Sequence, residues 1–522
     1  MPPAALCVHL CIGMAYGFSV FWIPLTKAVG VTHSVTCPES IGLLARITST
    51  TCDWDKPLLG WTYTLFFVFL GSSAALFGNW LERAGPRKAA TVAACCWCGG
   101  LAISAAGVYL HQLWMLWLGS GVIGGIGLGL GYISPVSTLI KWFPDRRGMA
   151  TGLAIMGFGG GAMVGSPLAD QLMSHFASAD SVGVWQTFLV LAATYFVFMM
   201  IGAFTYRVPP EGWTPQGATG ASKIAAARRA TSAAVSRSLT AAEACRTRQF
   251  WLAWAVLCLN VSAGIGVIGM ASPMLQEVFG GRLIGLSKPF EQLDASELAR
   301  VAAMGAGFTG LLSLFNILGR FGWSSLSDML GRKRTYAIFF LLGLALYVSV
   351  PALGRTGHVG LFCAAFCLIL TMYGGGFAAI PAYLADLFGT GSVGAIHGRL
   401  LTAWSVAGVL GPVLVNYVNE AQVRAGVPRA AAYDKTMFLL AGLLGIGLVC
   451  NGLIRGGVGG VPTPTRDVPA PVRGSAIVGS CASAMPPPRS QLIPLAALWL
   501  LVAVPMAWGL WHTIQQAAAL FR

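Results

Sequence analysis

Charged side chains are scarce in this chain of 522 residues. Asp, Glu, Lys and Arg together make up 10% of it, whereas soluble proteins hold roughly 25%. Hydrophobic residues make up 56%, and they gather in runs of about twenty residues, the length of a helix that crosses a bilayer. This composition excludes an ordinary soluble enzyme and predicts an all-α integral membrane protein.

Carboxylates are the scarcer of the two charges, with 18 Asp and Glu against 33 Lys and Arg. None lies near the middle of an apolar run, since Asp170 and Asp386 fall toward helix ends, so the sequence reveals no carboxylate relay for protons. No nucleophile–base pair and no cluster of metal ligands stands out either. We therefore expect a protein that is not an enzyme and that holds neither a cofactor nor a metal.

Twelve apolar runs are long enough to span a bilayer, and they form two sets of six. The first set lies near residues 5–26, 58–79, 89–110, 113–134, 150–172 and 185–206, and the second near 250–272, 302–324, 336–353, 360–383, 400–418 and 436–454. A thirteenth run at 492–511 is long enough to be a further span, although Pro494 and Pro505 weaken that prediction. The predicted parts are an N-terminal half at 1–207, a cytoplasmic linker at 208–249, a C-terminal half at 250–456, a flexible Pro-rich tail at 457–490 and an extra helix at 491–522.

Basic residues indicate how the chain is oriented. If the N-terminus is cytoplasmic, the inner loops hold about twice as many Lys and Arg as the outer loops, as the positive-inside rule requires. This placement accounts for the formal net charge of +15, so we expect no nucleic-acid partner. We expect a multi-pass protein of the cell inner (plasma) membrane, in contact with the lipid bilayer.

Two charged loops repeat at equivalent places in the two halves. They are residues 78–88, with the sequence GNWLERAGPRK, and residues 322–333, with the sequence GWSSLSDMLGRK. A carboxylate and several cations at helix ends can pair across the cytoplasmic mouth, while Gly permits the tight turn between the helices. We expect such a latch to hold the outward-open state, and its predicted residues are Glu82, Arg83, Gly85, Arg87, Asp328, Gly331 and Arg332.

These loops resemble the signature of the major facilitator superfamily, with Glu82 in place of the usual Asp. A transporter of that kind has two six-helix halves with substrate bound between them near the midplane. Further segments resemble the oxalate/formate antiporter family and its monocarboxylate-transporting relatives, and they are residues 127–135, 141–152, 316–320, 373–377 and 397–404. The resemblance covers roughly residues 5–455 and implies a bacterial inner-membrane transporter of small carboxylates such as oxalate, formate, lactate or pyruvate. We expect a monomer.

One cation, Arg320, lies deep in a predicted helix, about 12 Å from its cytoplasmic boundary. An unpaired guanidinium at that depth costs at least about 2.5–3.5 kcal/mol, which favours a functional role, and its planar fork can hold a carboxylate through two hydrogen bonds. By the resemblance, Arg320 matches the helix-eight Arg that binds substrate in the family's oxalate transporter. The alternative is a structural Arg satisfied by helix carbonyls or reaching the membrane surface.

The second cation of that site is missing. Where the oxalate transporter has a Lys in the context Thr-Ala-Lys, this chain reads Thr402-Ala403-Trp404. Beside one guanidinium a dianion would keep about one uncompensated charge, whereas a monoanion would be neutralised. The sequence therefore predicts a secondary active transporter of monocarboxylates (lactate, pyruvate or formate) that works by alternating access, as exchange or as symport with protons. Oxalate/formate antiport, another substrate on the same fold and a membrane sensor without net flux are the alternatives.

Aromatic residues of the expected cavity helices are candidates for the rest of the substrate site. Tyr16, Tyr132, Tyr373 and Trp404 could complete the hydrogen bonds of a carboxylate while their rings wall the cavity. Packing and interfacial roles are the alternative, because 11% of the chain is aromatic.

Two histidines and two cysteines complete the candidates. His9 and His397 could titrate near neutral pH or could serve the structure alone. Of the 13 Cys, only Cys37 and Cys52 lie in a loop predicted to face outside, where they could form a disulfide worth about 3 kcal/mol.

Overall fold

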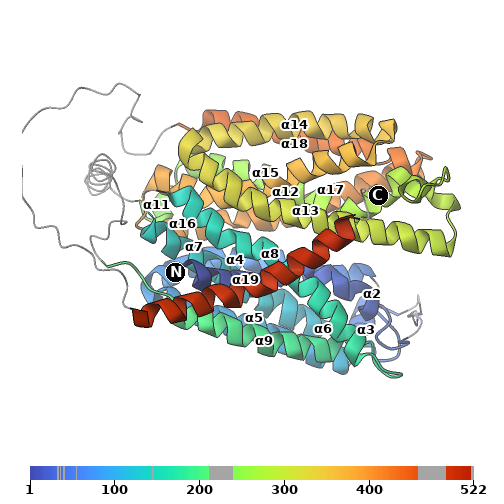
Figure 1. Cartoon of the computed structure of the whole chain (residues 1–522), viewed down its shortest axis with the longest axis horizontal. Helices are drawn as coiled ribbons and strands as arrows, with labels where there is room; N and C mark the ends of the chain where they lie inside the picture. The colour runs from blue at the N-terminus through green and yellow to red at the C-terminus, as the bar shows by residue number, and fades with distance from the viewer. Residues whose placement is uncertain are drawn as a thin grey trace, which may run out of the picture.

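The computed structural model of the protein is a bundle of long helices (Figure 1). It describes residues 1–31, 35, 37–38, 41–54, 56–143, 146–210, 239–455 and 489–518. Within these ranges the chain forms helices and no β-strand, and eleven helices are long and apolar enough to cross a membrane. The predicted all-α membrane architecture is confirmed. Most of the predicted linker at 208–249 and of the predicted tail at 457–490 lies outside the described residues.

The N-terminal half follows the predicted order of apolar runs. The first span begins as α1 (Pro2–Ile12) and continues through the 3₁₀ segment η1 (Gly13–Phe21) and α2 (Trp22–Leu25), after which the short α3 (Leu43–Thr48) lies in a loop. The remaining helices are α4 (Lys56–Ala84), α5 (Pro86–Tyr109), α6 (Leu113–Leu116) with the π segment η2 (Trp117–Gly124) and α7 (Gly125–Trp142), α8 (Arg147–Phe176) and α9 (Val184–Thr205).

The C-terminal half repeats this order. A short helix, α11 (Ala241–Cys245), precedes it. Its long helices are α12 (Arg248–Phe279), α13 (Ala295–Leu330), α14 (Arg332–Thr356), α15 (Val359–Phe388), α16 (Val393–Leu400) with α17 (Thr402–Arg424), and α18 (Asp434–Leu453). The last described helix is α19 (Arg489–Ala518), which contains the predicted thirteenth run.

Besides the fourth span, which passes through the π segment η2 between α6 and α7, two predicted spans differ from single α-helices. The first leaves α-helical geometry at Gly13, where it packs so closely on α8 that a Cβ would lie 2.2 Å from the carbonyl oxygen of Phe158. The eleventh begins at Val393, earlier than predicted, and is broken at Leu401, whose carbonyl oxygen would lie 2.8 Å from a Cβ on Gly71 of α4. In both places, backbone approach between helices sets the irregularity.

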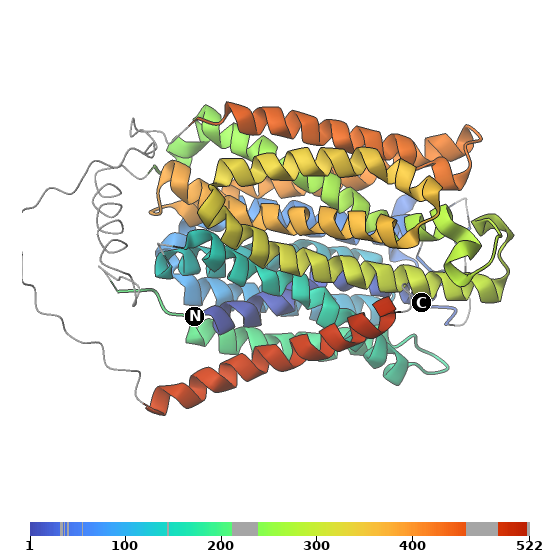
Figure 2. The same ribbon diagram turned by 45° about the horizontal axis from the view of Figure 1, so that its top comes forward.

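Helices from the two halves meet along two interfaces. In one, α8 of the N-terminal half packs on α13 and α15, and in the other α4 packs on α16 and α17. The helix α19 crosses the outside of the first interface and contacts both α8 and α13 (Figure 2). Its Val502 packs with Leu6 and Cys7 of α1, while its opposite face exposes apolar side chains such as Leu500 and Val504. Such a helix suits a position at the edge of the bundle in contact with lipid.

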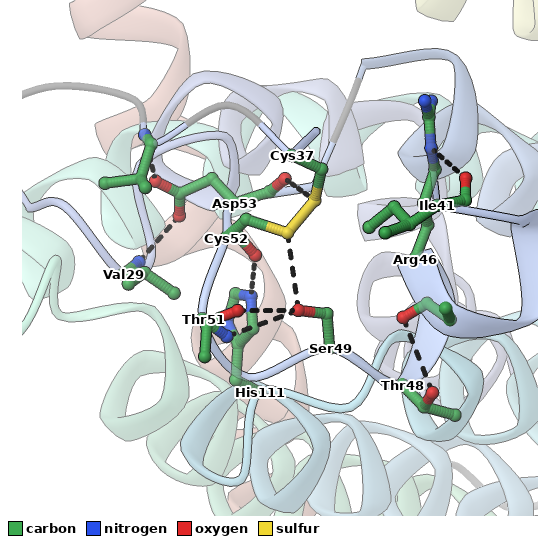
Figure 3. Close-up of a disulfide and its surroundings, with 12 residues drawn as sticks. Val29, Cys37, Ile41, Arg46, Thr48, Ser49, Thr51, Cys52, Asp53 and His111 are labelled. Carbon is green, nitrogen blue, oxygen red and sulfur yellow. Dashed lines mark hydrogen bonds between the residues drawn. A yellow bond between two sulfur atoms is a disulfide. The ribbon is translucent and has the colours of Figure 1, made fainter. Parts of the chain in front are cut away.

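The loop between the first two spans is tied together by a disulfide and by one buried carboxylate (Figure 3). Cys37 is bonded to Cys52, with a distance of 5.1 Å between their Cα atoms. The adjacent Asp53 accepts hydrogen bonds from the backbone N–H groups of Val29 at 2.6 Å and Val35 at 2.8 Å. His111 Nε2 donates to the carbonyl of Cys52 at 2.9 Å, and burial lowers the pKa of this histidine below its ordinary value.

Replacing both bonded cysteines (Cys37→Ser with Cys52→Ser) should lower the melting temperature of the detergent-solubilised protein. On the loop-closure argument the bond is worth about 3 kcal/mol. Reductant should lower the melting temperature of the native protein in the same way and leave that of the double variant unchanged. Cys95→Ser, at an exposed free cysteine, is the control. A native protein indifferent to reductant would contradict the prediction.

Candidate substrate site

Arg320 lies on α13, contacts α8 of the other half and is fully buried at 0% exposure. Its Nε donates to Oδ1 of Asn316 at 3.0 Å, and its Nη1 donates to the backbone carbonyl of Ile155 in α8 at 3.4 Å. Because α8 and α13 belong to different halves, this side chain connects the halves. Its Nη2 has no hydrogen-bond partner among the described residues, so the guanidinium is only partly satisfied by the protein.

Aromatic rings surround the guanidinium. Its central carbon lies 5.5 Å from the ring centroids of Phe158 and Phe377 and 6.0 Å from that of Tyr16. Rings at these distances stabilise a cation through their negative faces. Tyr16 also meets Tyr373 of the other half, with 3.1 Å between the two hydroxyl oxygens.

Tyr132 and Trp404 join the same cluster. The Trp404 ring is wholly buried and lies 4.3 Å from the ring of Phe377, 5.4 Å from that of Tyr132 and 6.3 Å from that of Tyr16. The five residues predicted for the substrate site are therefore brought together by five different elements: η1, α7, α13, α15 and α17.

Four buried polar groups in this cluster lack a hydrogen-bond partner within the described part of the chain. They are Nη2 of Arg320, the hydroxyl of Tyr132, Nε1 of Trp404 and Nε2 of His397. The His397 ring lies 6.0 Å from that of Tyr132. A buried polar group without a partner costs about 1–3 kcal/mol, so a ligand with hydrogen-bond acceptors would be stabilised here.

A cavity of about 40 Å³ is lined by Asn316, which accepts a hydrogen bond from Arg320, and by Tyr16, whose ring centroid lies 6.0 Å from the guanidinium. Its lining residues are Tyr16, Gly159, Ala162, Ile268, Leu312, Ser313, Asn316 and Leu370. None of these residues is charged, and Arg320 reaches the cavity lining through its hydrogen bond to Asn316. The space is small, which favours a ligand of a few heavy atoms.

A larger cavity, of about 470 Å³, lies where the C-terminal ends of α12 and α14 meet the N-terminal end of α18. Several charges along it are already paired: Glu277 with Arg429 at 3.1 Å, and Arg355 with Asp434. Its lining residues come from the C-terminal half. A site that must face both sides of the membrane in turn is better placed between the halves, which favours the cluster around Arg320.

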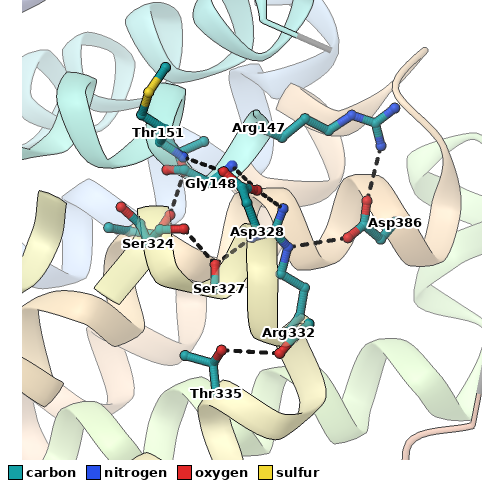
Figure 4. A network of polar contacts seen from close by, with 12 residues as sticks. Arg147, Gly148, Thr151, Ser324, Ser327, Asp328, Arg332, Thr335 and Asp386 are labelled. Atoms are coloured by element: carbon teal, nitrogen blue, oxygen red, sulfur yellow. Dashed lines mark hydrogen bonds and ion pairs between the residues drawn. The ribbon is translucent and has the colours of Figure 1, made fainter. Parts of the chain in front are cut away.

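The second charged loop forms contacts across the halves at the predicted cytoplasmic end (Figure 4). Asp328, near the end of α13, accepts hydrogen bonds from the backbone N–H groups of Gly148 and Met149 at the start of α8, each at 2.9 Å. Arg332 pairs with Asp328 and, at 3.2 Å, with Asp386. Arg147 of α8 reaches the same Asp386 at 3.0 Å.

The first charged loop makes the equivalent contact with the halves exchanged, because here the carboxylate belongs to the N-terminal half and the helix to the C-terminal half. Glu82, near the end of α4, accepts a hydrogen bond from the backbone N–H of Gly394 at the start of α16, at 2.9 Å, and pairs with Lys141 at 3.0 Å. Gly85 and Gly331 have positive φ angles of 83° and 87°, the backbone conformation that Gly adopts most easily. Each repeated carboxylate thus caps the first turn of a helix in the other half.

Not every residue predicted for the latch makes these contacts. Arg87 donates to the backbone carbonyl of Tyr206, within its own half, at 2.7 Å, and Arg83 is exposed. The cations that do take part alongside Arg332 are Lys141 and Arg147. Both lie in the segment 141–152, which resembles the oxalate/formate antiporter family but whose partners could not be assigned from sequence.

Replacing Asp328 by Asn should favour opening of the predicted cytoplasmic end. The change removes a charged acceptor of two backbone hydrogen bonds, and hydrogen bonds to charged groups are worth about 1.5–3 kcal/mol, so the closed population should fall roughly tenfold or more relative to the open one. Spin labels introduced as unnatural amino acids at the exposed positions Lys88 and Arg334 would report the distance between the halves. Asp434→Asn, which breaks a pair within one half, is the control, and identical distance distributions for the native protein and Asp328→Asn would contradict the prediction.

Comparison with known proteins agrees with this architecture. A family model described as the Major Facilitator Superfamily matches residues 5–412. The chain is 23% identical over 391 residues to the uncharacterized MFS-type transporter YhjX of Escherichia coli, covering 74% of this chain and 86% of that one. It is 26% identical over 292 residues to the oxalate:formate antiporter of Oxalobacter formigenes (55% and 59%), and 25% identical over 453 residues to apicoplast pyruvate carrier 1 of Toxoplasma gondii (75% and 78%).

Solved structures show the same fold. The proton:xylose symporter XylE bound to 6-bromo-6-deoxy-D-glucose matches with a TM-score of 0.61 at 15% identity, covering 87% of this chain and 95% of that one. Two six-helix halves, repeated charged loops and a family match over most of the chain lead to one conclusion: the chain belongs to the Major Facilitator Superfamily.

Proposed function

We propose that this protein is a secondary active transporter of small organic anions, with monocarboxylates such as lactate, pyruvate or formate as its substrates. The observation that carries the proposal is the fully buried guanidinium of Arg320, which lies between the halves and has an Nη2 without a partner among the described residues. A carboxylate can take two hydrogen bonds from one guanidinium. It would supply the negative charge that the surroundings of Arg320 lack.

The charge of the site favours a monoanion. Among the residues of the aromatic cluster and of the cavity beside it, Arg320 is the one with a formal charge, and Trp404 stands where the resemblance to the oxalate/formate antiporter family leads one to expect a second cation. A dianion in this place would keep about one charge away from water without a partner. A monocarboxylate would be neutralised.

The size and polarity of the site agree with the same class of substrate. The hydroxyl of Tyr132 and the indole N–H of Trp404, both without a partner within the described residues, can donate to carboxylate or hydroxyl oxygens. The rings of Phe158 and Phe377 can contact a hydrogen or methyl end. By their names, two relatives act on small carboxylates: one exchanges oxalate and formate, and one carries pyruvate.

Alternating access is the proposed mechanism. Carboxylates of both halves cap helices of the opposite half at the predicted cytoplasmic end, so this end is closed while those contacts persist. Breaking them would let the halves rock about the central site and open it to the other side. Each contact consists of a few hydrogen bonds and ion pairs between partly buried side chains, which water can solvate once the halves separate, so the contacts can break within a transport cycle.

Counterflow uptake into proteoliposomes tests the substrate class. Labelled lactate, pyruvate or formate should enter at least about tenfold faster than labelled oxalate, because an uncompensated buried charge costs more than the 1.4 kcal/mol that a factor of ten represents. Arg320→Gln should abolish uptake, and Arg320→Lys should restore part of it, since Lys keeps the charge but loses the planar fork. Arg355→Gln, at an exposed cation, is the control. Native rates in Arg320→Gln, or oxalate uptake as fast as lactate uptake, would overturn the proposal.

Trp404→Lys provides a complementary test, because it restores a second cation to the site. The ratio of oxalate to lactate uptake should rise by about tenfold or more, since the second carboxylate then gains a partner. Trp404→Gln removes the ring without adding charge, and it should leave the ratio near its native value. If Lys and Gln shift the ratio equally, the single-cation explanation of selectivity is wrong.

A further inference from the structure

A basic cavity lies at the predicted cytoplasmic end of the N-terminal half, where α5 begins and α9 ends. Its volume is about 440 Å³, and the charged residues that line it are Arg87, Lys88 and Arg207. The other described lining residues, among them Gly85 and Pro86, are uncharged. The cavity therefore gathers three positive charges without a carboxylate among the described residues of its lining.

The three cations have no counter-ion within the described part of the chain. Their side chains are exposed, and no ion pair joins them to another described residue. Arg87 donates from Nε to the backbone carbonyl of Tyr206 at 2.7 Å, which holds the guanidinium at the cavity but does not neutralise it. An anion placed among the three side chains would be attracted by all of them.

The first turn of α5 adds donors of a second kind. The helix begins at Pro86 after Gly85, which has no side chain to cap it, and its first turn contains no acidic residue. The N–H groups of Arg87 and Lys88 precede the first intrahelical hydrogen bond, which Ala89 donates to Gly85 at 3.2 Å. Free N–H groups and the helix dipole both favour a phosphate at such an end. The cavity and its cations define the site, and the helix end supports it.

The equivalent loop of the C-terminal half is neutralised by the protein itself. Pro86 is matched there by Arg332, which pairs with Asp328 and, at 3.2 Å, with Asp386. Glu82, the carboxylate of the loop before α5, is instead directed to the other half and to a lysine of α7. Among the residues that the structure describes, the excess of positive charge is therefore local to the start of α5.

The segment that follows the cavity in the sequence does not supply the missing charge by its composition. Residues 211–238 lie outside the described ranges and contain one carboxylate, Glu211, against four cations. These cations are Lys223, Arg228, Arg229 and Arg237. Because a segment with excess positive charge is not attracted to a basic cavity, an anion from outside the chain is the better match.

The position of the cavity selects a lipid among the possible anions. The helices α5 and α9 pack on each other, and α9 lies at the edge of the bundle (Figure 1). Phe204 in the last turn of α9 and Val208 just beyond it are 67% and 53% exposed, as expected of apolar side chains that face lipid. The cytoplasmic leaflet contains anionic phospholipids. Their acyl chains would contact these apolar side chains while the headgroup reaches the cations.

We propose that this cavity binds the phosphate of an anionic phospholipid, such as phosphatidylglycerol, from the leaflet at the predicted cytoplasmic face. The phosphodiester carries one negative charge and accepts hydrogen bonds from Arg87, Lys88 and Arg207 at the start of α5. Its binding reduces the repulsion among the three cations and so stabilises the folded protein. The inference is independent of the proposed function, because none of these residues lines the candidate substrate cavity.

Titration of the detergent-solubilised protein with short-chain phosphatidylglycerol at low salt tests the site. The melting temperature should rise and saturate, because the lipid binds the folded state. Lys88→Gln with Arg207→Gln removes two exposed cations, and the apparent Kd should rise by about 25-fold, since each cation at a membrane surface changes binding of an anionic lipid by about fivefold. Arg248→Gln with Arg334→Gln removes two exposed cations at the same predicted end of the other half. This matched control should change the apparent Kd less than about twofold. Equal losses in the two double variants would show that the whole basic surface attracts lipid, and would overturn the site.

Other probes in the same titration identify the anion and its source. Short-chain phosphatidylcholine, whose headgroup has no net charge, should need a concentration at least about tenfold higher for the same rise in melting temperature. Glycerol 3-phosphate and inorganic phosphate lack acyl chains and should also be at least about tenfold weaker. Phosphatidylcholine as effective as phosphatidylglycerol would overturn the role of the charge. Glycerol 3-phosphate as effective as phosphatidylglycerol would assign the cavity to a soluble phosphate and overturn the lipid proposal.

Native mass spectrometry provides a measurement that needs no variant. The native protein, released from micelles that contain equal amounts of phosphatidylglycerol and phosphatidylcholine, should retain one phosphatidylglycerol in preference to phosphatidylcholine. Retention of the two lipids in equal proportion, or of neither, would contradict the proposal.

Discussion

A guanidinium held away from water is the constraint on which the centre of this molecule depends. Removing a cation from water costs several kcal/mol unless its surroundings replace the lost hydration. Around Arg320 the replacement comes from both halves: an amide oxygen of Asn316, a backbone carbonyl of Ile155 and nearby aromatic rings. The replacement is incomplete, because Nη2 has no partner among the described residues. Full compensation would make a purely structural cation, whereas partial compensation leaves a site that an anion completes.

At the predicted cytoplasmic end, the contacts that hold the two halves together are of limited strength. Glu82 and Asp328 bond to backbone N–H groups at the start of a helix in the opposite half, where the helix dipole favours negative charge. These carboxylates are only partly buried, with 17% and 14% of their side chains exposed, and water can solvate them once the halves separate. The contacts can therefore hold one conformation without making it permanent. The duplication of the chain provides two such contacts, related by the repeat, and a rocking motion must break both.

Much of this architecture could be predicted from sequence, and the exceptions share a physical cause. The spans follow from the length of the apolar runs, and Arg320 stands out because intramembrane charge is rare. The 3₁₀ segment after Ile12 and the break at Leu401 were not predicted, since a uniformly apolar run gives no periodic signal and both irregularities arise where glycine lets another helix approach. The partners of Glu82 and His9 were missed for a related reason. They are backbone N–H and C=O groups, which every residue has and which only the packing of helices brings into place.

The long contact between Arg320 and Ile155 bears on how substrate binding would drive transport. A ligand moves a conformational equilibrium only by binding one state more tightly than another. In the empty site, one terminal nitrogen of Arg320 reaches across the halves to a neutral carbonyl at 3.4 Å, near the upper limit for a hydrogen bond. A carboxylate would offer shorter, charge-assisted bonds, so the guanidinium would exchange a weak contact with α8 for a strong one with the ligand. On the proposed function, that exchange frees α13 from α8 only when substrate is present, which discourages the empty carrier from reorienting and so favours coupled transport over leakage.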